Sequence, residues 1–237
     1  MTALGGVAMV TTCLADLSSV ADGFGLVYGS SVTRDARTAP SDLDFVLVTA
    51  EPLTDQLRAT LATGIRQAHS GHGLPIDQEV PYENKLTATY EDVAAACSLT
   101  CFPQLGSQQA RPVTESDPYL YSEDFRLRLL LNALTTPHAL IWGSIEALST
   151  ATAAAEQAVA RLGLMLTMPT ADFTAEPLVE ALLRSPAGAE GKDYLGFSSP
   201  VHLFGVVSRG LAAMSDAGLV APAGAGLWRF DSAGSQS

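Results

Sequence analysis

Basic residues are scarce in this chain. It contains 13 lysines and arginines against 25 aspartates and glutamates, which gives a formal net charge of -12. Nucleic-acid binding draws much of its affinity from basic side chains that neutralise phosphates, and the sequence contains no basic stripe and no basic-aromatic cluster. We therefore expect no nucleic-acid partner, and a role in polymerisation or tRNA modification is disfavoured.

Cysteines and long apolar runs are also few. The three cysteines are too few, and odd in number, for a disulfide framework. Although 47% of the residues are hydrophobic, no uninterrupted apolar stretch is long enough to cross a bilayer. Residues 1–17 contain no basic side chain, so they do not resemble a secretory signal peptide. We expect a cytoplasmic protein with no membrane partner.

The apolar pattern changes near residue 115. Before it, strand and helix patterns alternate, which predicts a small mixed sheet with helices packed on one face. The predicted helices lie around residues 10–21, over 54–69 and from residue 90, and the predicted strands end at Gly29 or cover 42–48 and 75–80. After it, apolar residues recur at helical spacing over 122–135, 151–167, 175–184 and 200–217. The sequence thus predicts an α+β fold with an all-helical C-terminal domain.

The most informative pattern begins with a turn. A short apolar strand ending at Tyr28 leads into Gly29-Ser30-Ser31. Glycine permits a tight turn there, and the backbone N–H groups and hydroxyls of such a turn can hold phosphate oxygens.

Two aspartates then open the next apolar run. Asp42 and Asp44 are two residues apart, so on a strand they project from one face while Phe45 and Leu47 face the core. Neighbouring carboxylates repel each other unless a cation lies between them, and Mg²⁺ binds one or two carboxylates together with phosphates. The pattern predicts a magnesium site beside a phosphate-binding turn.

This order of strand, Gly29-Ser30, Arg34 and Ser41-Asp42-Leu43-Asp44 resembles the polymerase-beta-type nucleotidyltransferase superfamily, particularly its minimal bacterial members and the aminoglycoside nucleotidyltransferases. The resemblance is specific over residues 26–48, weaker to about residue 86, and absent beyond. It implies a mixed-sheet nucleotidyltransferase catalytic domain, which the change of pattern near residue 115 bounds to 1–115. The helical pattern over 116–237 is interpreted as an acceptor-site or homodimerisation domain. The resemblance also implies two Mg²⁺ ions and a nucleoside triphosphate as co-substrate. Where many relatives have a glycine after the arginine, this chain has Asp35.

A third metal-binding carboxylate is implied by the resemblance, and two residues are candidates. Asp77 and Glu79 share one face of the strand predicted over 75–80. Asp77 follows an apolar residue at the strand start and is favoured as the ligand, with Glu79 as general base. The reverse assignment stays open, as does the reading of either residue as a solvent-facing acid.

Four further residues have both a functional and an ordinary interpretation. Arg34 and Lys85 could contact the triphosphate, or they could form surface charges. His138 and His202 stand alone in the sequence, and each could have a substrate-binding or catalytic role or be an isolated structural histidine.

The predicted activity is Mg²⁺-dependent transfer of a nucleoside monophosphate from a triphosphate to a hydroxyl of a small molecule, with release of pyrophosphate. The acidic composition favours an amino-bearing acceptor such as an aminoglycoside. One alternative is a nucleotidyltransferase-like regulatory or antitoxin module that binds or modifies a protein partner. Another is a metal-dependent glycosyltransferase with an Asp-x-Asp pair, against which the Gly29-Ser30 turn argues.

Overall fold

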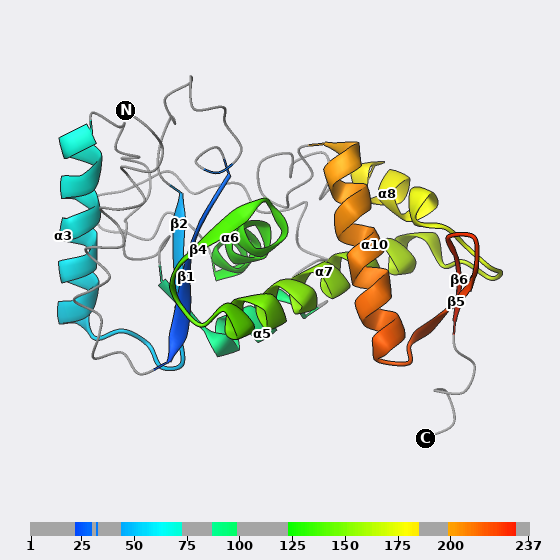
Figure 1. Ribbon diagram of the computed structural model, residues 1–237, viewed down its shortest axis with the longest axis horizontal. Helices are drawn as coiled ribbons and strands as arrows, with labels where there is room; N and C mark the ends of the chain where they lie inside the picture. Colours follow the sequence, from blue (N-terminus) through cyan, green and yellow to red (C-terminus); the bar gives the residue numbers. More distant parts are fainter. Residues whose placement is uncertain are drawn as a thin grey trace.

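The computed structural model describes residues 22–29, Val32, 44–72, 87–98, 123–184 and 199–230. These residues form an α+β fold, with a mixed four-stranded sheet and its helices followed by a helical C-terminal region and a small hairpin. The sheet and the hairpin lie towards opposite ends of the molecule, and the long helix α7 (Ile145–Thr167) runs between them (Figure 1). The predicted α+β class is confirmed.

The sheet has the strand order β3-β2-β1-β4. β1 (Gly23–Tyr28) is antiparallel to β2 (Phe45–Thr49) and to β4 (His138–Gly143), and β3 (Thr87–Thr89) runs parallel to β2. β1 and β2 correspond to the predicted strands that end at Gly29 and Val48. β3 and β4 have no counterpart in the sequence prediction, because β3 is only three residues long and β4 is a short apolar stretch between two helices.

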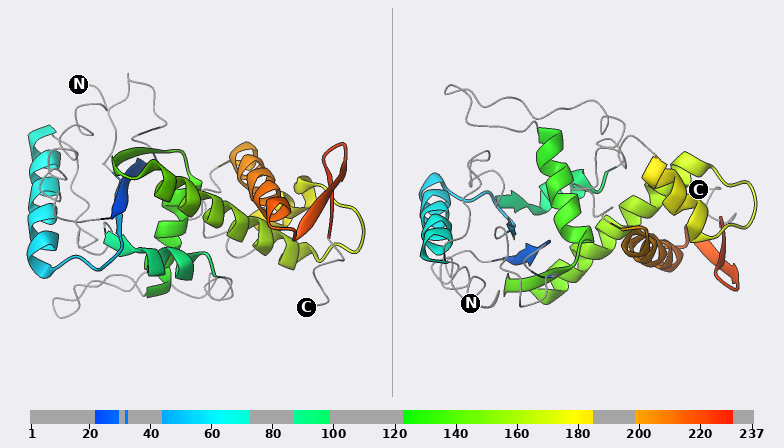
Figure 2. Two further views of the ribbon diagram at one scale, coloured as in Figure 1. Left: turned by 60° about the horizontal axis from the view of Figure 1, so that its bottom comes forward. Right: turned by 90° about the horizontal axis from the view of Figure 1, so that it is seen from above.

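Helices lie on both sides of the sheet, which corrects the prediction that they pack on one face. α3 (Asp55–His72) lies on one side, whereas α5 (Tyr90–Ala96) and α6 (Glu123–Thr135) lie on the other, as the three views agree (Figures 1 and 2). Every residue of β1 and β2 is buried. Strands covered on both faces form continuous apolar runs, so the alternation that would mark a single core face is lost.

Local capping residues set most helix boundaries. Thr54 caps α3 by accepting the N–H of Leu57 at 3.3 Å. Ser199 caps α10 (Pro200–Asp216), and Pro200 occupies the first turn. α7 begins at Ile145 rather than at residue 151, because Ser144 supplies an N-cap whose hydroxyl accepts the N–H of Ala147 at 3.1 Å.

The C-terminal region contains a hairpin, so it is not all-helical. α10 ends at Asp216, and Gly218 just beyond it has a positive φ of 69° that glycine readily adopts. β5 (Val220–Gly224) and β6 (Leu227–Phe230) then pair in antiparallel fashion, and β6 bridges to Phe173 ahead of α8 (Ala175–Arg184). Hairpin strands this short leave little periodicity to detect in a sequence.

Several predicted features lie outside the described residues. These are the helix over 10–21, the strand over 75–80, and the division of the chain at residue 115. β4 comes from beyond that division and completes the sheet through its pairing with β1. Among the helices that are described, none has the length and apolar character needed to cross a membrane.

Candidate functional site

Gly29 and Asp44 lie next to each other at one end of the sheet. Val27 on β1 is paired with Phe45 on β2, so the end of one strand meets the start of the other. The N–H of Tyr28 donates to the carbonyl of Asp44 at 3.1 Å and extends this ladder beyond β2. The structure therefore brings together one residue of the predicted phosphate-binding turn and one of the predicted metal ligands.

The carboxylate of Asp44 is directed towards Gly29. A Cβ atom built on Gly29 would lie 3.3 Å from Oδ2 of Asp44, which is tighter than most contacts that real Cβ atoms make. Gly29 also has a φ of +68°, in the left-handed region that disfavours other residues. Glycine thus serves two purposes here: it permits the turn, and it leaves space beside the carboxylate.

The hydrogen bonds of Gly29 differ from the sequence prediction. Its N–H donates to the carbonyl of Pro137 at 3.3 Å, and its own carbonyl accepts the N–H of Val32 at 3.1 Å. The amide is therefore directed at the segment before β4 rather than at a phosphate. The role of Gly29 in the site therefore comes from its lack of a side chain, and not from the amide donor that the sequence predicts.

The carboxylate of Asp44 could bind a hard cation, but Asp44 is only one of the metal ligands that the sequence predicts. Its half-buried carboxylate supplies the oxygen donors that Mg²⁺ prefers, at the end of the sheet and beside a residue without a side chain. Within the described part of the chain, no group of three or more histidine, cysteine, aspartate or glutamate side chains could hold a metal ion. The other predicted site residues lie outside that part and stay predictions: Ser30, Ser31, Arg34, Asp42, Asp77, Glu79 and Lys85.

Gly29→Ala tests this contact, with Gly218→Ala as a matched control. Gly218 has nearly the same φ, +69°, but a Cβ there would meet nothing within 4 Å. Both variants should lose roughly 1–2 kcal/mol of stability from the left-handed backbone. Only Gly29→Ala should also reduce transfer activity, by up to about 10²-fold if the carboxylate moves by an ångström. Thermal unfolding and initial rates measure the two effects, and equal activities of the two variants would contradict the assignment.

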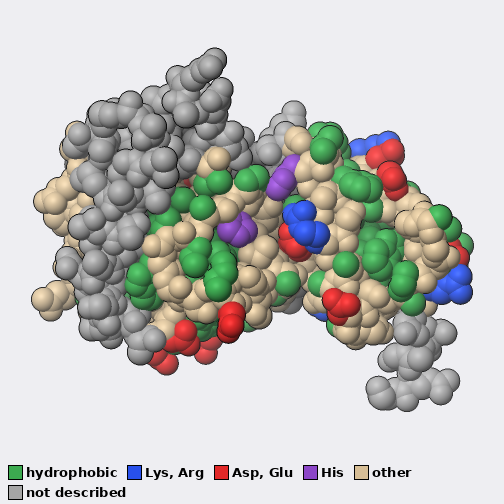
Figure 3. Space-filling model, in the orientation of Figure 1, with side chains coloured by type: hydrophobic (Ala, Val, Ile, Leu, Met, Phe, Trp, Pro, Cys, Tyr) green, Lys and Arg blue, Asp and Glu red, His purple; other side chains and the backbone are tan. Residues whose placement is uncertain are grey.

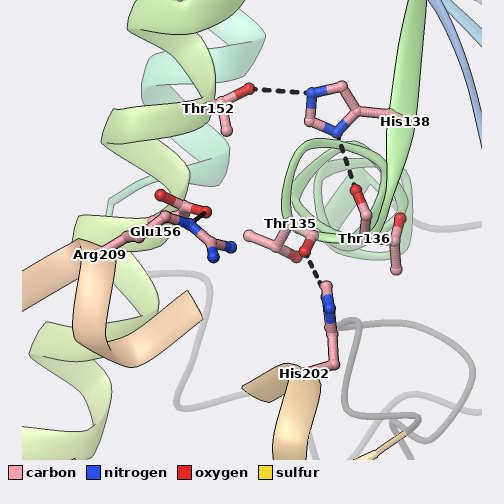
Figure 4. A network of polar contacts seen from close by, with 7 residues as sticks. All are labelled: Thr135, Thr136, His138, Thr152, Glu156, His202 and Arg209. Atoms are coloured by element: carbon pink, nitrogen blue, oxygen red, sulfur yellow. Dashed lines mark hydrogen bonds and ion pairs between the residues drawn. The ribbon is translucent and has the colours of Figure 1, made fainter. Parts of the chain in front are cut away.

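A cluster of polar side chains lies on the far side of β1 from Asp44. Of its members, the sequence indicates only His138 and His202 as candidates. We call it the His/Arg cluster: His138, Glu156, His202 and Arg209, with Thr135, Thr136 and Thr152 around them (Figure 4). His138 is paired with Tyr28 in the β4–β1 register. The cluster therefore begins next to the strand end that carries Gly29.

Backbone carbonyls hold both imidazoles in the cluster. Nδ1 of His138 lies 2.8 Å from the carbonyl of Thr136, and Nε2 of His202 lies 2.7 Å from that of Thr135. Because a carbonyl only accepts hydrogen bonds, these two ring nitrogens carry protons. Nε2 of His138 lies 3.4 Å from the hydroxyl of Thr152 on α7. The two histidines that the sequence left isolated thus take part in one network.

The centre of the cluster is an ion pair that the sequence patterns do not identify. Glu156 is only 6% exposed, and its Oε1 accepts a hydrogen bond of 2.6 Å from Nε of Arg209. Burial raises the pKa of the Glu156 carboxyl above its ordinary value, even though Arg209 and, more weakly, His138 and His202 act to lower it. Glu156 lies in an alanine-rich helix and its partner is 53 residues away, so spacing alone carries no signal of the pair.

No protein-family model, curated protein or solved structure matches this chain. The function is therefore inferred from the residues and their geometry. The two features with chemical content are the Gly29–Asp44 contact and the adjacent His/Arg cluster.

Proposed function

We propose that this protein is a Mg²⁺-dependent nucleotidyltransferase that transfers a nucleoside monophosphate from a triphosphate to a hydroxyl of a small-molecule acceptor. The supporting observation is the contact between Gly29 and Asp44. The sequence motif requires the glycine of the turn and the second aspartate of the Asp-x-Asp pair to act on the same triphosphate. In the fold Gly29 directly follows β1 and Asp44 directly precedes β2, and the two lie together with the carboxylate beside the glycine.

Asp44 and the predicted ligand Asp42 would hold Mg²⁺ at this end of the sheet. The bound ion offsets triphosphate charge and stabilises the oxygens that enter and leave during transfer. Gly29 keeps the space beside Asp44 open, and the hydrogen bonds of Tyr28 to Asp44 and of Gly29 to Pro137 hold the turn against β2 and the start of β4. This rigid placement is what an in-line reaction requires of the protein.

In the proposed reaction the acceptor oxygen forms a bond to the α-phosphorus, and the bond from that phosphorus to the β-phosphate oxygen breaks. The acceptor proton passes to a carboxylate, for which Asp77 and Glu79 are the predicted candidates. Pyrophosphate leaves with the electron pair of the broken bond, so no covalent enzyme intermediate and no redox partner are required.

The test is an assay of the purified protein with Mg²⁺, each of the four nucleoside triphosphates, and a panel of hydroxyl-bearing metabolites that includes cationic and anionic members. We expect pyrophosphate release that needs both metal and acceptor, and a product heavier than the acceptor by one nucleotidyl group. Release of a nucleoside diphosphate from a nucleotide sugar would instead indicate glycosyl transfer. Modification of a protein rather than a metabolite would indicate the regulatory alternative.

A further inference from the structure

The His/Arg cluster has no role in the reaction as described so far. Its members come from β4 at the edge of the sheet and from α7 and α10, which extend from the sheet towards the hairpin (Figure 1). In the space-filling view, histidine side chains and an adjacent basic and acidic side chain lie close together on one face over these elements (Figure 3). The cluster is thus accessible from solvent.

One nitrogen of the Arg209 guanidinium is hydrogen-bonded within the protein, and the two terminal nitrogens are available to a ligand. Its side chain is 58% exposed, while that of Glu156 is 8% exposed. Nε donates to Glu156, and no acceptor among the described residues is bonded to the two terminal nitrogens. Figure 4 shows the guanidinium directed towards Thr135, whose carbonyl is bonded to His202. Glu156 therefore acts as a positioning residue that fixes the fork of Arg209.

The cluster is less acidic than the protein as a whole. One guanidinium balances the single buried carboxylate and two imidazoles flank the pair, whereas the chain carries a net charge of -12. A cationic group would meet the guanidinium, and the carboxylate that could attract it is already bonded to that guanidinium. A planar guanidinium fork instead matches the two oxygens of a carboxylate or phosphate.

The cluster lies too far from Asp44 to serve the same phosphates directly. Asp44 directly precedes β2, Tyr28 ends β1 and His138 begins β4, which places Asp44 and His138 roughly 10 Å apart at two strand spacings. Glu156 lies one helical turn beyond Thr152, the residue that contacts His138, and Arg209 lies beyond Glu156. A triphosphate held at Asp44 would have to cross β1 and β4 to reach Arg209.

We infer that Arg209, flanked by His138 and His202 and positioned by Glu156, forms a subsite for an anionic group, a phosphate or carboxylate, of the acceptor substrate. The acceptor is accordingly an anionic hydroxyl compound rather than the amino-bearing compound that the overall composition favours. The assignment of the anion to the acceptor rests on the proposed transfer reaction. The existence of the anion subsite does not.

The test uses inorganic phosphate as the probe, in calorimetric titrations of the full chain at low ionic strength. Arg209→Gln should weaken phosphate binding at least about tenfold, because charge-assisted hydrogen bonds are lost. Arg209→Lys, which keeps the charge without the fork, should recover part of the affinity. Arg229→Gln is the matched control, since Arg229 is 56% exposed and paired with Asp172 at 3.0 Å far from the cluster. It should bind phosphate like the unmodified protein.

Histidine ring signals in NMR spectra locate the bound probe. Phosphate should shift the ring signals of His138 and His202, identified through His138→Gln and His202→Gln, and Arg209→Gln should suppress these shifts. Equal phosphate affinity of Arg209→Gln and Arg229→Gln, or unchanged ring signals, would overturn the subsite.

A second titration, with a non-hydrolysable triphosphate and Mg²⁺, identifies the source of the anion. Arg209→Gln should bind this nucleotide normally, whereas Gly29→Ala should bind it more weakly. If Arg209→Gln weakens nucleotide binding as much as phosphate binding, the cluster serves the triphosphate and the acceptor assignment is wrong. If the unmodified protein binds phosphate at Arg209 but does not bind the nucleotide, the transfer reaction and the acceptor assignment both fail, while the anion subsite stands.

Discussion

Asp44→Asn is expected to abolish nucleotidyl transfer while leaving the fold intact. The substitution keeps the shape of the side chain and the backbone hydrogen bond from Tyr28, but it removes the charge that would hold Mg²⁺ beside Gly29. Metal stabilisation of transferring phosphoryl oxygens amounts to several kcal/mol. A loss of roughly 10³-fold or more in kcat follows from that energy. Pyrophosphate release at saturating Mg²⁺ is the measurement.

Asp22→Asn provides the matched control for Asp44→Asn. Asp22 directly precedes β1 as Asp44 directly precedes β2, and it lies at the opposite end of the sheet, where its carbonyl accepts the N–H of Ala50. Its carboxylate accepts a hydrogen bond from the hydroxyl of Tyr90 at 3.2 Å, which an asparagine oxygen can also accept. This variant should retain activity. Full activity in Asp44→Asn would disprove the metal-ligand assignment, and loss of its circular-dichroism spectrum would indicate a structural role instead.

Gly210→Ala should produce the largest loss of stability among single-methyl additions in α10. A Cβ atom at this position would lie 2.2 Å from the carbonyl oxygen of Glu156 and 2.8 Å from Cβ of Ala160. Both atoms are part of helix α7, so α7 and α10 would have to move apart. Overpacking typically costs about 1–3 kcal/mol and occasionally more, and a backbone clash should lie at or above the upper end of that range. Total stabilities are only about 5–15 kcal/mol.

Urea unfolding measures this effect, with Gly205→Ala as the control on the same helix. A Cβ on Gly205 would lie 3.2 Å from a terminal nitrogen of Arg209, and a shift of this exposed side-chain end by a few tenths of an ångström relieves the contact. Alanine is a better helix former than glycine by roughly 1 kcal/mol, so this variant should be as stable as the unmodified protein or more so. A similar unfolding midpoint for the two variants would show that α7 and α10 do not pack as closely as described.

Features that depend on short stretches of chain are predictable from the sequence. The α+β class, the strands ending at Tyr28 and covering Phe45–Val48, α5, α8 and α10 follow from apolar periodicity and from caps such as Ser199. The Gly-Ser turn and the Asp-x-Asp pair identify a candidate site in the same way, because each is a run of a few residues. Such local patterns can be recognised without knowing which elements pack against each other.

Features that depend on residues far apart in the chain become visible in the fold and not in the sequence. The pairing of β4 with β1 directs the amide of Gly29 at Pro137 and places His138 beside the site, and no local pattern contains that pairing. The close approach of α7 and α10 joins Glu156 to Arg209, and it places an exposed guanidinium beside two histidines in an acidic protein. Net charge is a sum over the whole chain. The charge that a ligand meets is set by the few side chains that the fold brings within hydrogen-bonding distance.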